Sequence, residues 1–222
     1  MAHLDKLRIS RRATLACVLL FGLVAMPGIC ACTSAQSDTG LSAEDARQAY
    51  EEGDFAGATQ RAEAIVSDDP GNLDARRVLA LALAAQGDNE GAIEHYVYVL
   101  EKQPEDHVTL YQVAMLERVI GRTGDAIGHL EAAVALKSDP SYLDDLARTY
   151  MQVGRYEEAA KLWGRVLEDE DLDETSRVEL LVLQADAYED ARMYDEARGA
   201  LEKALFLDPN NEELKERIKA LE

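Results

Sequence analysis

The sequence has few basic residues, with 23 Lys and Arg against 43 Asp and Glu and a formal net charge of -20. Proteins that bind nucleic acid displace counterions from phosphates with clustered Lys and Arg, so this balance excludes a nucleic-acid-binding protein. Aromatic residues make up only 6% of the chain, but 47% of its residues are hydrophobic, and Ala and Leu recur at regular spacing. The chain can therefore bury a core, which argues against intrinsic disorder and favours one or two helical domains.

The sequence also lacks the motifs of common catalytic and metal-binding sites. It has no G-x-S-x-G motif, no phosphate-binding glycine loop, and no cysteine beyond residue 32. Its later histidines are His95, His107 and His129, and no further His or Cys accompanies them at metal-ligand spacing. We interpret His95 and His129 as surface residues of two helices. We expect a protein that is not an enzyme and that has no cofactor, no metal and no small-molecule substrate.

Six acids crowd the segment from Glu168 to Glu174. A calcium-binding loop would need a glycine and alternating ligands, and this run has neither. We interpret it as a solvated loop whose acids favour the N-terminus of the following helix. Contact with a basic partner is the alternative.

Residues 1–31 have the layout of an export signal. Basic residues up to Arg12 precede an uncharged apolar run at residues 13–26, which Pro27 and Gly28 end. A helix that spans a membrane needs about 20 apolar residues, so this shorter run favours a cleaved signal over an uncleaved transmembrane anchor, which is the alternative.

The residues Ile29-Cys30-Ala31-Cys32 resemble a bacterial lipobox with Cys32 as the acceptor. The resemblance implies removal of residues 1–31, lipidation of Cys32, a polar linker at residues 32–40, and attachment to a membrane through the N-terminal lipid. Because Thr rather than Asp follows Cys32, enterobacteria-like sorting implies the periplasmic face of the outer membrane. The alternatives are an inner-membrane anchor, or an ordinary signal-peptidase cut that gives a soluble periplasmic protein. In the lipidated chain no free thiol is left, so no disulfide forms.

An internal repeat organises the rest of the chain. Glycines recur 34 or 33 residues apart, each followed five residues later by Ala, and three prolines lie twelve residues beyond their alanine. The glycines are Gly53, Gly87, Gly121 and Gly154, the alanines are Ala58, Ala92, Ala126, Ala159 and Ala197, and the prolines are Pro70, Pro104 and Pro209. Arg192 occupies the glycine place before Ala197. This pattern resembles the tetratricopeptide repeat (TPR), a helix-turn-helix unit.

The resemblance implies an all-α fold, an α-solenoid of about five TPR units over residues 41–211 with a C-terminal capping helix. We place the repeats at residues 39–72, 73–106, 107–139, 140–173 and 178–211, with an insertion at 174–177 and the capping helix at 212–222. Two helices approach closely where side chains are small, so we expect alanines of first helices to face alanines of second helices. Leu214, Ile218 and Leu221 share one face of the capping segment and would cover the last repeat.

In tetratricopeptide repeat proteins the first helices line a concave groove, so the resemblance implies groove-facing positions in each repeat. Carried onto this chain they are Arg47, Tyr50, Arg77, Leu81, Ala84, Val108, Tyr111, Met115, Arg118, Val119, Asp144, Arg148, Met151, Glu179, Val182, Asp186, Glu189 and Asp190. One interpretation is a groove with an apolar centre, arginines that hold peptide carboxylates or carbonyls, and an acidic far end. The other is that Leu81 and Met115 pack between repeats and that the arginines offset neighbouring acids.

The resemblance implies a membrane-anchored scaffold that binds a protein or peptide and supports assembly of an envelope complex. Lipoproteins of pilus assembly and pilotins for secretin pores are the most similar by size and repeat count. A soluble periplasmic chaperone or regulator is an alternative, as is an adaptor for peptidoglycan hydrolases or for β-barrel assembly.

Overall fold

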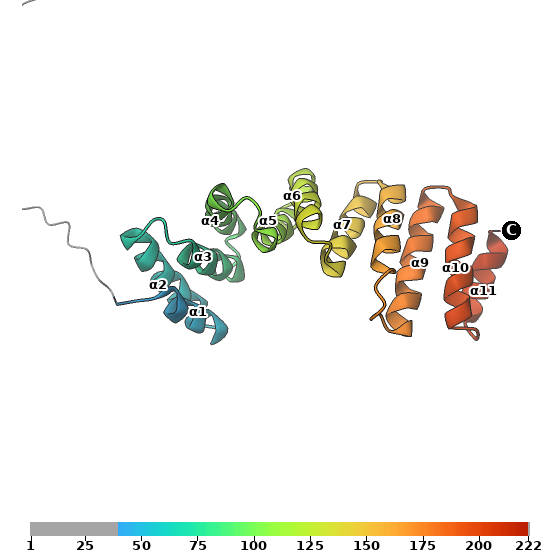
Figure 1. The fold of residues 1–222 in the computed structure, drawn as a ribbon, viewed down its shortest axis with the longest axis horizontal. Coiled ribbons are helices and arrows are strands. Elements are labelled where there is room, and N and C mark those ends of the chain that lie inside the picture. Colours follow the sequence, from blue (N-terminus) through green and yellow to red (C-terminus); the bar gives the residue numbers. More distant parts are fainter. Residues whose placement is uncertain (1–39, 222) are drawn as a thin grey trace, which may run out of the picture. The chain divides into compact units, whose positions relative to one another are not determined.

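A computed structural model describes residues 40–221, which form eleven α-helices in series and contain no strand (Figure 1). The export signal, Cys32 and all but the last residue of the linker lie outside the described residues. Within the described range, no helix has both the length and the apolar character that a membrane span requires. The prediction of an all-α solenoid of about five repeats is confirmed.

Each repeat contributes two helices, and each helix packs against the next one along the chain. The first helices are α1 (Ala43–Glu51), α3 (Leu73–Ala85), α5 (His107–Val119), α7 (Pro140–Gln152) and α9 (Glu174–Asp190). The second helices are α2 (Phe55–Asp68), α4 (Asn89–Lys102), α6 (Thr123–Leu136), α8 (Tyr156–Val166) and α10 (Tyr194–Leu207). The capping helix is α11 (Glu212–Ala220).

The helix boundaries follow from short polar residues and from glycines. Asp or Asn side chains accept a hydrogen bond from the first turn of most helices, as Asp54 does from the main-chain N–H of Gly57 at 2.9 Å. Each of the first four repeats ends its first helix with a glycine at positive φ, between 78° at Gly154 and 87° at Gly87. Arg192 takes the same conformation in the fifth repeat, with φ 61°. The prolines follow the ends of second helices, where they prevent continuation.

Small side chains let the paired helices approach closely. Alanines of the first and second helices are fully buried in every repeat from the second onward: Ala80, Ala92, Ala114, Ala126, Ala147, Ala159, Ala185 and Ala197. Trp163 is the largest fully buried side chain and belongs to the core that runs through α5 to α9.

Two segments shape the C-terminal end. Residues 174–177, which the sequence marks as an insertion, form the first turn of α9 and make it the longest helix of the described chain. In α11, Leu214 is buried, and Ile218 and Leu221 pack partly against the core of the last repeat. This helix therefore covers an apolar surface that the fifth repeat would otherwise expose.

Candidate functional site

The candidate groove residues all lie on first helices, and four of them surround one cavity of about 330 Å³. We call it the first-helix cavity, and it is lined by Arg118, Arg148, Met151, Gln152, Trp163, Leu183 and Asp186. Arg118, Arg148, Met151 and Asp186 belong to the predicted groove set. They come from three first helices, α5, α7 and α9, so the repeat brings successive units to the same face.

Trp163 reaches the cavity from a second helix, α8, so it does not belong to the predicted groove set, which comes from first helices. Its indole Nε1 donates a hydrogen bond to Oδ1 of Asp144 at 2.8 Å. The other carboxylate oxygen of Asp144 accepts from Nε of Arg148 at 2.7 Å. One carboxylate on α7 therefore fixes both the aromatic floor and a cationic rim of the cavity.

Asp145, the next residue of α7, also accepts hydrogen bonds from two side chains. It accepts a hydrogen bond from the Tyr111 hydroxyl at 2.6 Å and another from Nη1 of Arg118 at 2.7 Å. Burial, and then the bond to Asp145, raise the pKa of Tyr111 above its ordinary value, so the phenol stays protonated. Tyr111 also stacks on Tyr142 with 4.4 Å between the ring centroids. The sequence placed Tyr111 and Arg118 on the groove face but did not reveal that one Asp holds both.

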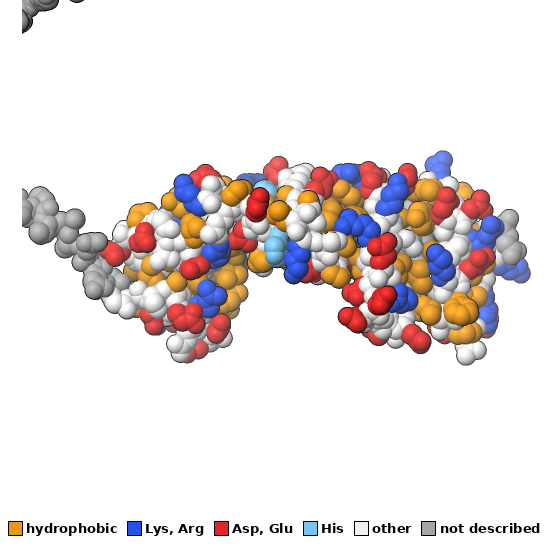
Figure 2. Space-filling view, viewed as in Figure 1, with side chains coloured by type: hydrophobic (Ala, Val, Ile, Leu, Met, Phe, Trp, Pro, Cys, Tyr) orange, Lys and Arg blue, Asp and Glu red, His pale blue; other side chains and the backbone are white. Residues whose placement is uncertain are grey.

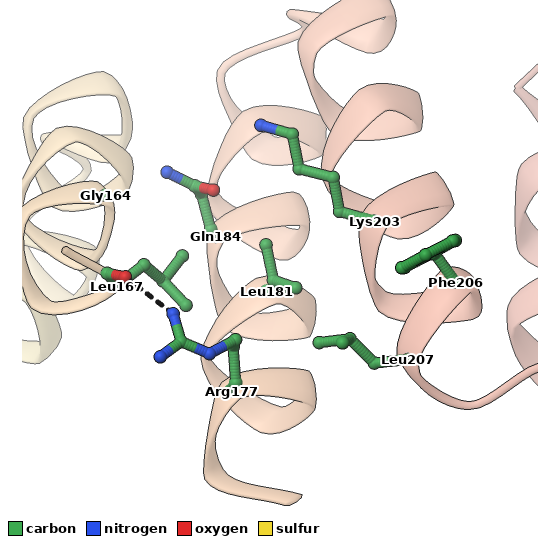
Figure 3. A pocket seen from close by; sticks show the side chains of 8 residues that line it. All are labelled: Gly164, Leu167, Arg177, Leu181, Gln184, Lys203, Phe206 and Leu207. Atoms are coloured by element: carbon green, nitrogen blue, oxygen red, sulfur yellow. Dashed lines mark hydrogen bonds between the residues drawn. The ribbon is translucent and has the colours of Figure 1, made fainter. Parts of the chain in front are cut away.

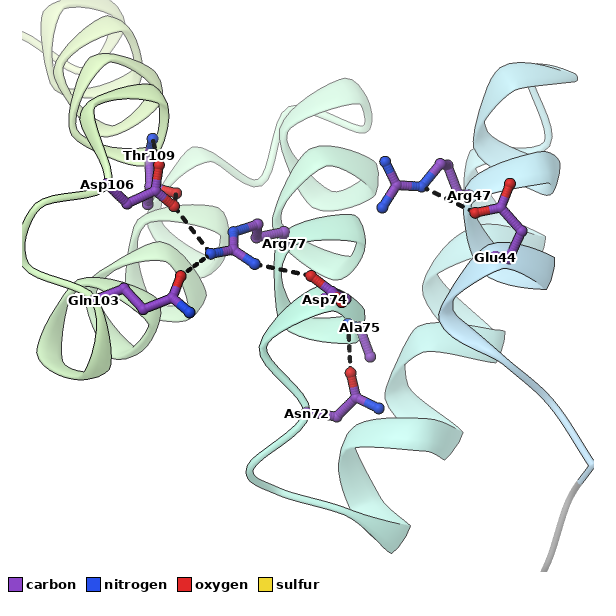
Figure 4. Close-up of polar contacts among 9 residues, drawn as sticks. All are labelled: Glu44, Arg47, Asn72, Asp74, Ala75, Arg77, Gln103, Asp106 and Thr109. Carbon is purple, nitrogen blue, oxygen red and sulfur yellow. Dashed lines mark hydrogen bonds and ion pairs between the residues drawn. The ribbon is translucent and has the colours of Figure 1, made fainter. Parts of the chain in front are cut away.

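Arg77 lies in a similar network between the second and third repeats (Figure 4). Its guanidinium pairs with Asp74 at 2.9 Å and with Asp106 at 3.0 Å, and it also bonds to Gln103. Although burial raises the pKa of Asp106, hydrogen bonds from Thr109 and Arg77 together hold it below its ordinary value. Figure 4 also shows Arg47, which among residues 40–221 pairs only with Glu44 of its own helix, at 3.4 Å.

The predicted acidic end of the groove is partly neutralised. Nη2 of Arg217, on the capping helix, lies 2.6 Å from Asp186 and 2.5 Å from Glu189. Glu179 and Asp190 are exposed, and Val182 packs partly against the core of the last repeat. Arg217 therefore reduces the negative charge at this end of the groove. The sequence did not reveal that α11 supplies this arginine.

The apolar groove candidates divide between packing and exposure. Leu81, Ala84, Met115 and Met151 are half-buried against the cores between helices, as is Tyr50. Val108 and Val119 are exposed, Val119 by 71%. Several candidates therefore pack between repeats and the arginines pair with acids, and a cavity remains among them. Binding of a peptide by this face stays a prediction.

The interpretation of His95 and His129 as surface residues needs correction, because both are half-buried against first helices. His129 Nδ1 lies 2.8 Å from Oε2 of the buried Glu117, and His95 Nδ1 lies 3.3 Å from Arg76. Burial and the nearby Arg76 lower the pKa of His95. Over residues 40–221, no group of three or more His, Cys, Asp or Glu side chains is arranged to hold a metal ion.

Comparisons with known proteins agree with this architecture. Family models described as tetratricopeptide repeat match residues 49–116 and residues 145–212, together more than half of the chain. No curated protein sequence matches it.

Solved structures resemble the chain at low sequence identity. YrrB, described as a TPR protein with an unusual peptide-binding site, has a TM-score of 0.66 and 15% identity, and the match covers 85% of this chain and 98% of YrrB. MamA has a TM-score of 0.64 and 21% identity over 74% of this chain and 88% of MamA. A tetratricopeptide repeat protein from Parabacteroides merdae has a TM-score of 0.64 and 20% identity, over 84% of this chain and 73% of that protein. At these identities the likeness shows the fold alone.

Proposed function

Because this chain is a tetratricopeptide repeat protein, we propose that it is a non-catalytic scaffold whose first-helix cavity captures a segment of a partner protein. The observation that carries the proposal is that two arginines and three apolar side chains line the same cavity. Met151, Trp163 and Leu183 give the floor, and Arg118 and Arg148 stand beside it. An apolar pocket with a few fixed polar groups is the usual form of a binding site.

The arginines retain hydrogen-bonding capacity for a ligand. A guanidinium has five N–H donors, and Arg148 uses its Nε for Asp144, which leaves its terminal nitrogens for carboxylate or carbonyl oxygens of a peptide. Asp186 on the opposite side of the cavity suits a basic or amide group, although Arg217 already offsets part of its charge. YrrB, a relative in fold, is described by its peptide-binding site, which supports the same kind of ligand here.

Replacement of Arg148 by Ala tests the cavity. Arg148 is 48% exposed and makes one ion pair within its own helix, so its loss should leave the fold intact. Arg198→Ala is a matched control, because Arg198 makes the same kind of intrahelical pair on a second helix, away from the cavity. Cross-linked affinity capture from intact envelopes should lose a set of partners with Arg148→Ala and keep it with Arg198→Ala. Equal recovery from both variants would contradict the proposal.

We further propose that Cys32 carries a lipid that holds the repeat domain on the periplasmic face of the outer membrane, where it supports assembly of a pilus or secretin complex. The lipobox-like residues before Cys32 support the anchor. Three acyl chains would make attachment stable, whereas a single chain gives marginal, reversible binding. Labelling with radioactive palmitate should mark the wild type and leave Cys32→Ala unlabelled. A wild type without label would favour the soluble periplasmic chaperone or regulator. Capture of peptidoglycan hydrolases or of β-barrel assembly proteins would favour an adaptor for those systems over a role in pilus or secretin assembly.

A further inference from the structure

A second cavity, of about 410 Å³, lies among α8, α9 and α10 (Figure 3). We call it the second-helix pocket. Its apolar wall comes from Leu167, Leu181, Phe206 and Leu207. Polar groups stand at its ends, with Lys203 and Gln184 at one end and Arg177 at the other.

The second-helix pocket is distinct from the first-helix cavity, although both use α9. Residues of an α-helix advance by about 100° each, so Arg177, Leu181 and Gln184 share one side of α9. Leu183 and Asp186, which line the first-helix cavity, lie on the opposite side. A ligand in one cavity therefore leaves the other accessible.

The sequence departs from the repeat at Gly164, which lines the pocket. Gly164 lies five residues after Ala159, the alanine that recurs in each repeat. At the equivalent position the other four repeats have Glu63, Val97, Glu131 and Glu202. A Cβ at Gly164 would approach Nε2 of Gln184 to 3.0 Å, so a side chain at this position would occupy the pocket. Glycine at this position therefore leaves the α8 side of the pocket without a side chain.

Phe206 provides an exposed aromatic ring at the edge of the pocket. It is 84% exposed, more than any other large hydrophobic residue of the described chain. The equivalent residues in the other repeats are Ser67, Glu101, Ala135 and Glu168, so the repeat itself does not require an aromatic residue here. An exposed ring next to an apolar pocket is typical of a contact surface.

Charge distinguishes the possible occupants. The loop from Glu168 to Glu174 adjoins the pocket, because Arg177 donates from Nη1 to the carbonyl oxygen of Leu167 and from Nη2 to that of Asp169, at 2.8 Å each. Arg177 therefore fixes the backbone of the loop, and among residues 40–221 none of the six loop carboxylates forms an ion pair. Figure 2 shows acidic atoms gathered around this loop, next to hydrophobic surface at the C-terminal end of α10. Six acids against Arg177 and Lys203 make the local field negative.

We propose that the second-helix pocket is a docking site for a basic amphipathic segment of a partner protein. One large apolar side chain of the segment enters between Leu181 and Leu207 and packs against Phe206. Lys or Arg residues on one side of that anchor face the carboxylates of the loop. Lys203, which has no hydrogen bond or ion pair within the described residues, repels a basic residue at the other end of the pocket and so fixes the direction of the segment.

Fluorescence anisotropy with synthetic peptides tests the proposal on the full chain. The probe peptide carries three lysines followed by a Leu-Phe pair, and the comparison peptide carries three glutamates in their place. The lysine peptide should bind about tenfold more tightly at low salt, and the difference should shrink as salt screens the loop. Equal affinity of the two peptides, or absence of binding by the lysine peptide, would overturn the proposal.

Gly164→Gln tests the pocket without a change of charge. It should weaken binding of the lysine peptide by about tenfold, because the anchor can no longer be buried. Gly128→Gln is the matched control, because a Cβ at Gly128 meets no atom within 4 Å. Both variants should keep the helical circular dichroism of the wild type, since Gln favours helix over Gly. Unchanged affinity in folded Gly164→Gln would show that the peptide binds elsewhere.

Neutralisation of the loop tests the charge separately. Glu168→Gln, Glu170→Gln and Asp171→Asn together should weaken the lysine peptide by about fivefold and remove most of its salt dependence. The control neutralises three exposed acids of other repeats: Glu51, Glu63 and Glu101. Lys203→Glu should instead strengthen binding by a few fold. If the wild type sediments as a dimer that Phe206→Ala dissociates, the occupant is a second copy of this chain and the proposal is wrong.

Discussion

Asp145 joins α5 to α7 beside the first-helix cavity, and we predict that Asp145→Ala loosens this junction. Its two carboxylate oxygens accept bonds of 2.6 Å from the Tyr111 hydroxyl and 2.7 Å from Arg118. The side chains of Asp145 and Arg118 are 24% and 22% exposed, so water replaces these bonds only in part. Loss of the carboxylate leaves two half-buried donors without their acceptor.

The expected loss of stability follows from these contacts. A hydrogen bond that involves a charged group contributes about 1.5 to 3 kcal/mol, and partial exposure of the ion pair reduces its share. We therefore expect Asp145→Ala to lower the free energy of unfolding by about 2 to 3 kcal/mol. In a domain of this size each kcal/mol lowers Tm by about 2 to 4 °C, which gives a decrease of about 4 to 12 °C.

Urea unfolding followed by circular dichroism measures the effect, with Tyr111→Phe as the second arm of a double-mutant cycle. Tyr111→Phe alone should lower the free energy of unfolding by about 1 kcal/mol. The double variant should lose less than the sum of the two single changes by at least about 0.5 kcal/mol, because both remove the same bond. A change below about 0.5 kcal/mol for Asp145→Ala, or strict additivity, would refute the assigned role.

Three further predictions concern the repeat core, a histidine and the capping helix. Ala126→Leu should lower the free energy of unfolding by about 1 to 3 kcal/mol, because Ala126 is fully buried where two helices meet; a melting curve like that of the wild type would contradict this. The pKa of His95 is lowered by burial and by Arg76, so the unfolded chain binds more protons near pH 6, and stability should rise with pH up to the unfolded pKa. Urea titrations at pH 5.5 and 7.5 should show a smaller rise in His95→Gln. Leu214→Ala should cost about 2 to 4 kcal/mol and speed hydrogen exchange in α10 and α11 more than in α3.

Most of the fold was predictable, because the repeat depends on local chemistry that can be read from the sequence. Gly87 and its equivalents stand where a helix ends in a left-handed conformation, which glycine adopts without the strain of a side chain. Ala92 and its equivalents stand where two helices approach. Residues 174–177 were harder to assign, because the repeat spacing starts the fifth unit at residue 178. In the structure, the side chain of Asp173 accepts a hydrogen bond from the main-chain N–H of Ser176, so α9 begins one turn earlier.

The candidate site was only partly predictable, because some of its residues do not lie on first helices, from which the groove positions were taken. Position in the repeat placed Arg118 and Arg148 on first helices, and in the structure both line the first-helix cavity. Trp163 belongs to a second helix, and its contribution depends on a hydrogen bond to Asp144, 19 residues away. Arg217 reaches Asp186 across 31 residues from the capping helix. With 43 acids and 23 bases in the chain, charge alone does not indicate which acid pairs with which arginine.

The pairing of the arginines also separates their roles in stability and in binding. Arg118 is 22% exposed and links α5 to Asp145 on α7, so its loss should reduce stability. Arg148 is 48% exposed and pairs with Asp144 one turn away on the same helix, so its pair contributes little to stability, and its terminal nitrogens are available to a ligand. We therefore expect Arg118→Ala to lower Tm more than Arg148→Ala. In affinity capture, Arg148→Ala should reduce the amount of recovered partner at least as much as Arg118→Ala does. If Arg118→Ala lowered both Tm and partner recovery more than Arg148→Ala, loss of partner would follow from loss of stability. The first-helix cavity would then not be the binding site.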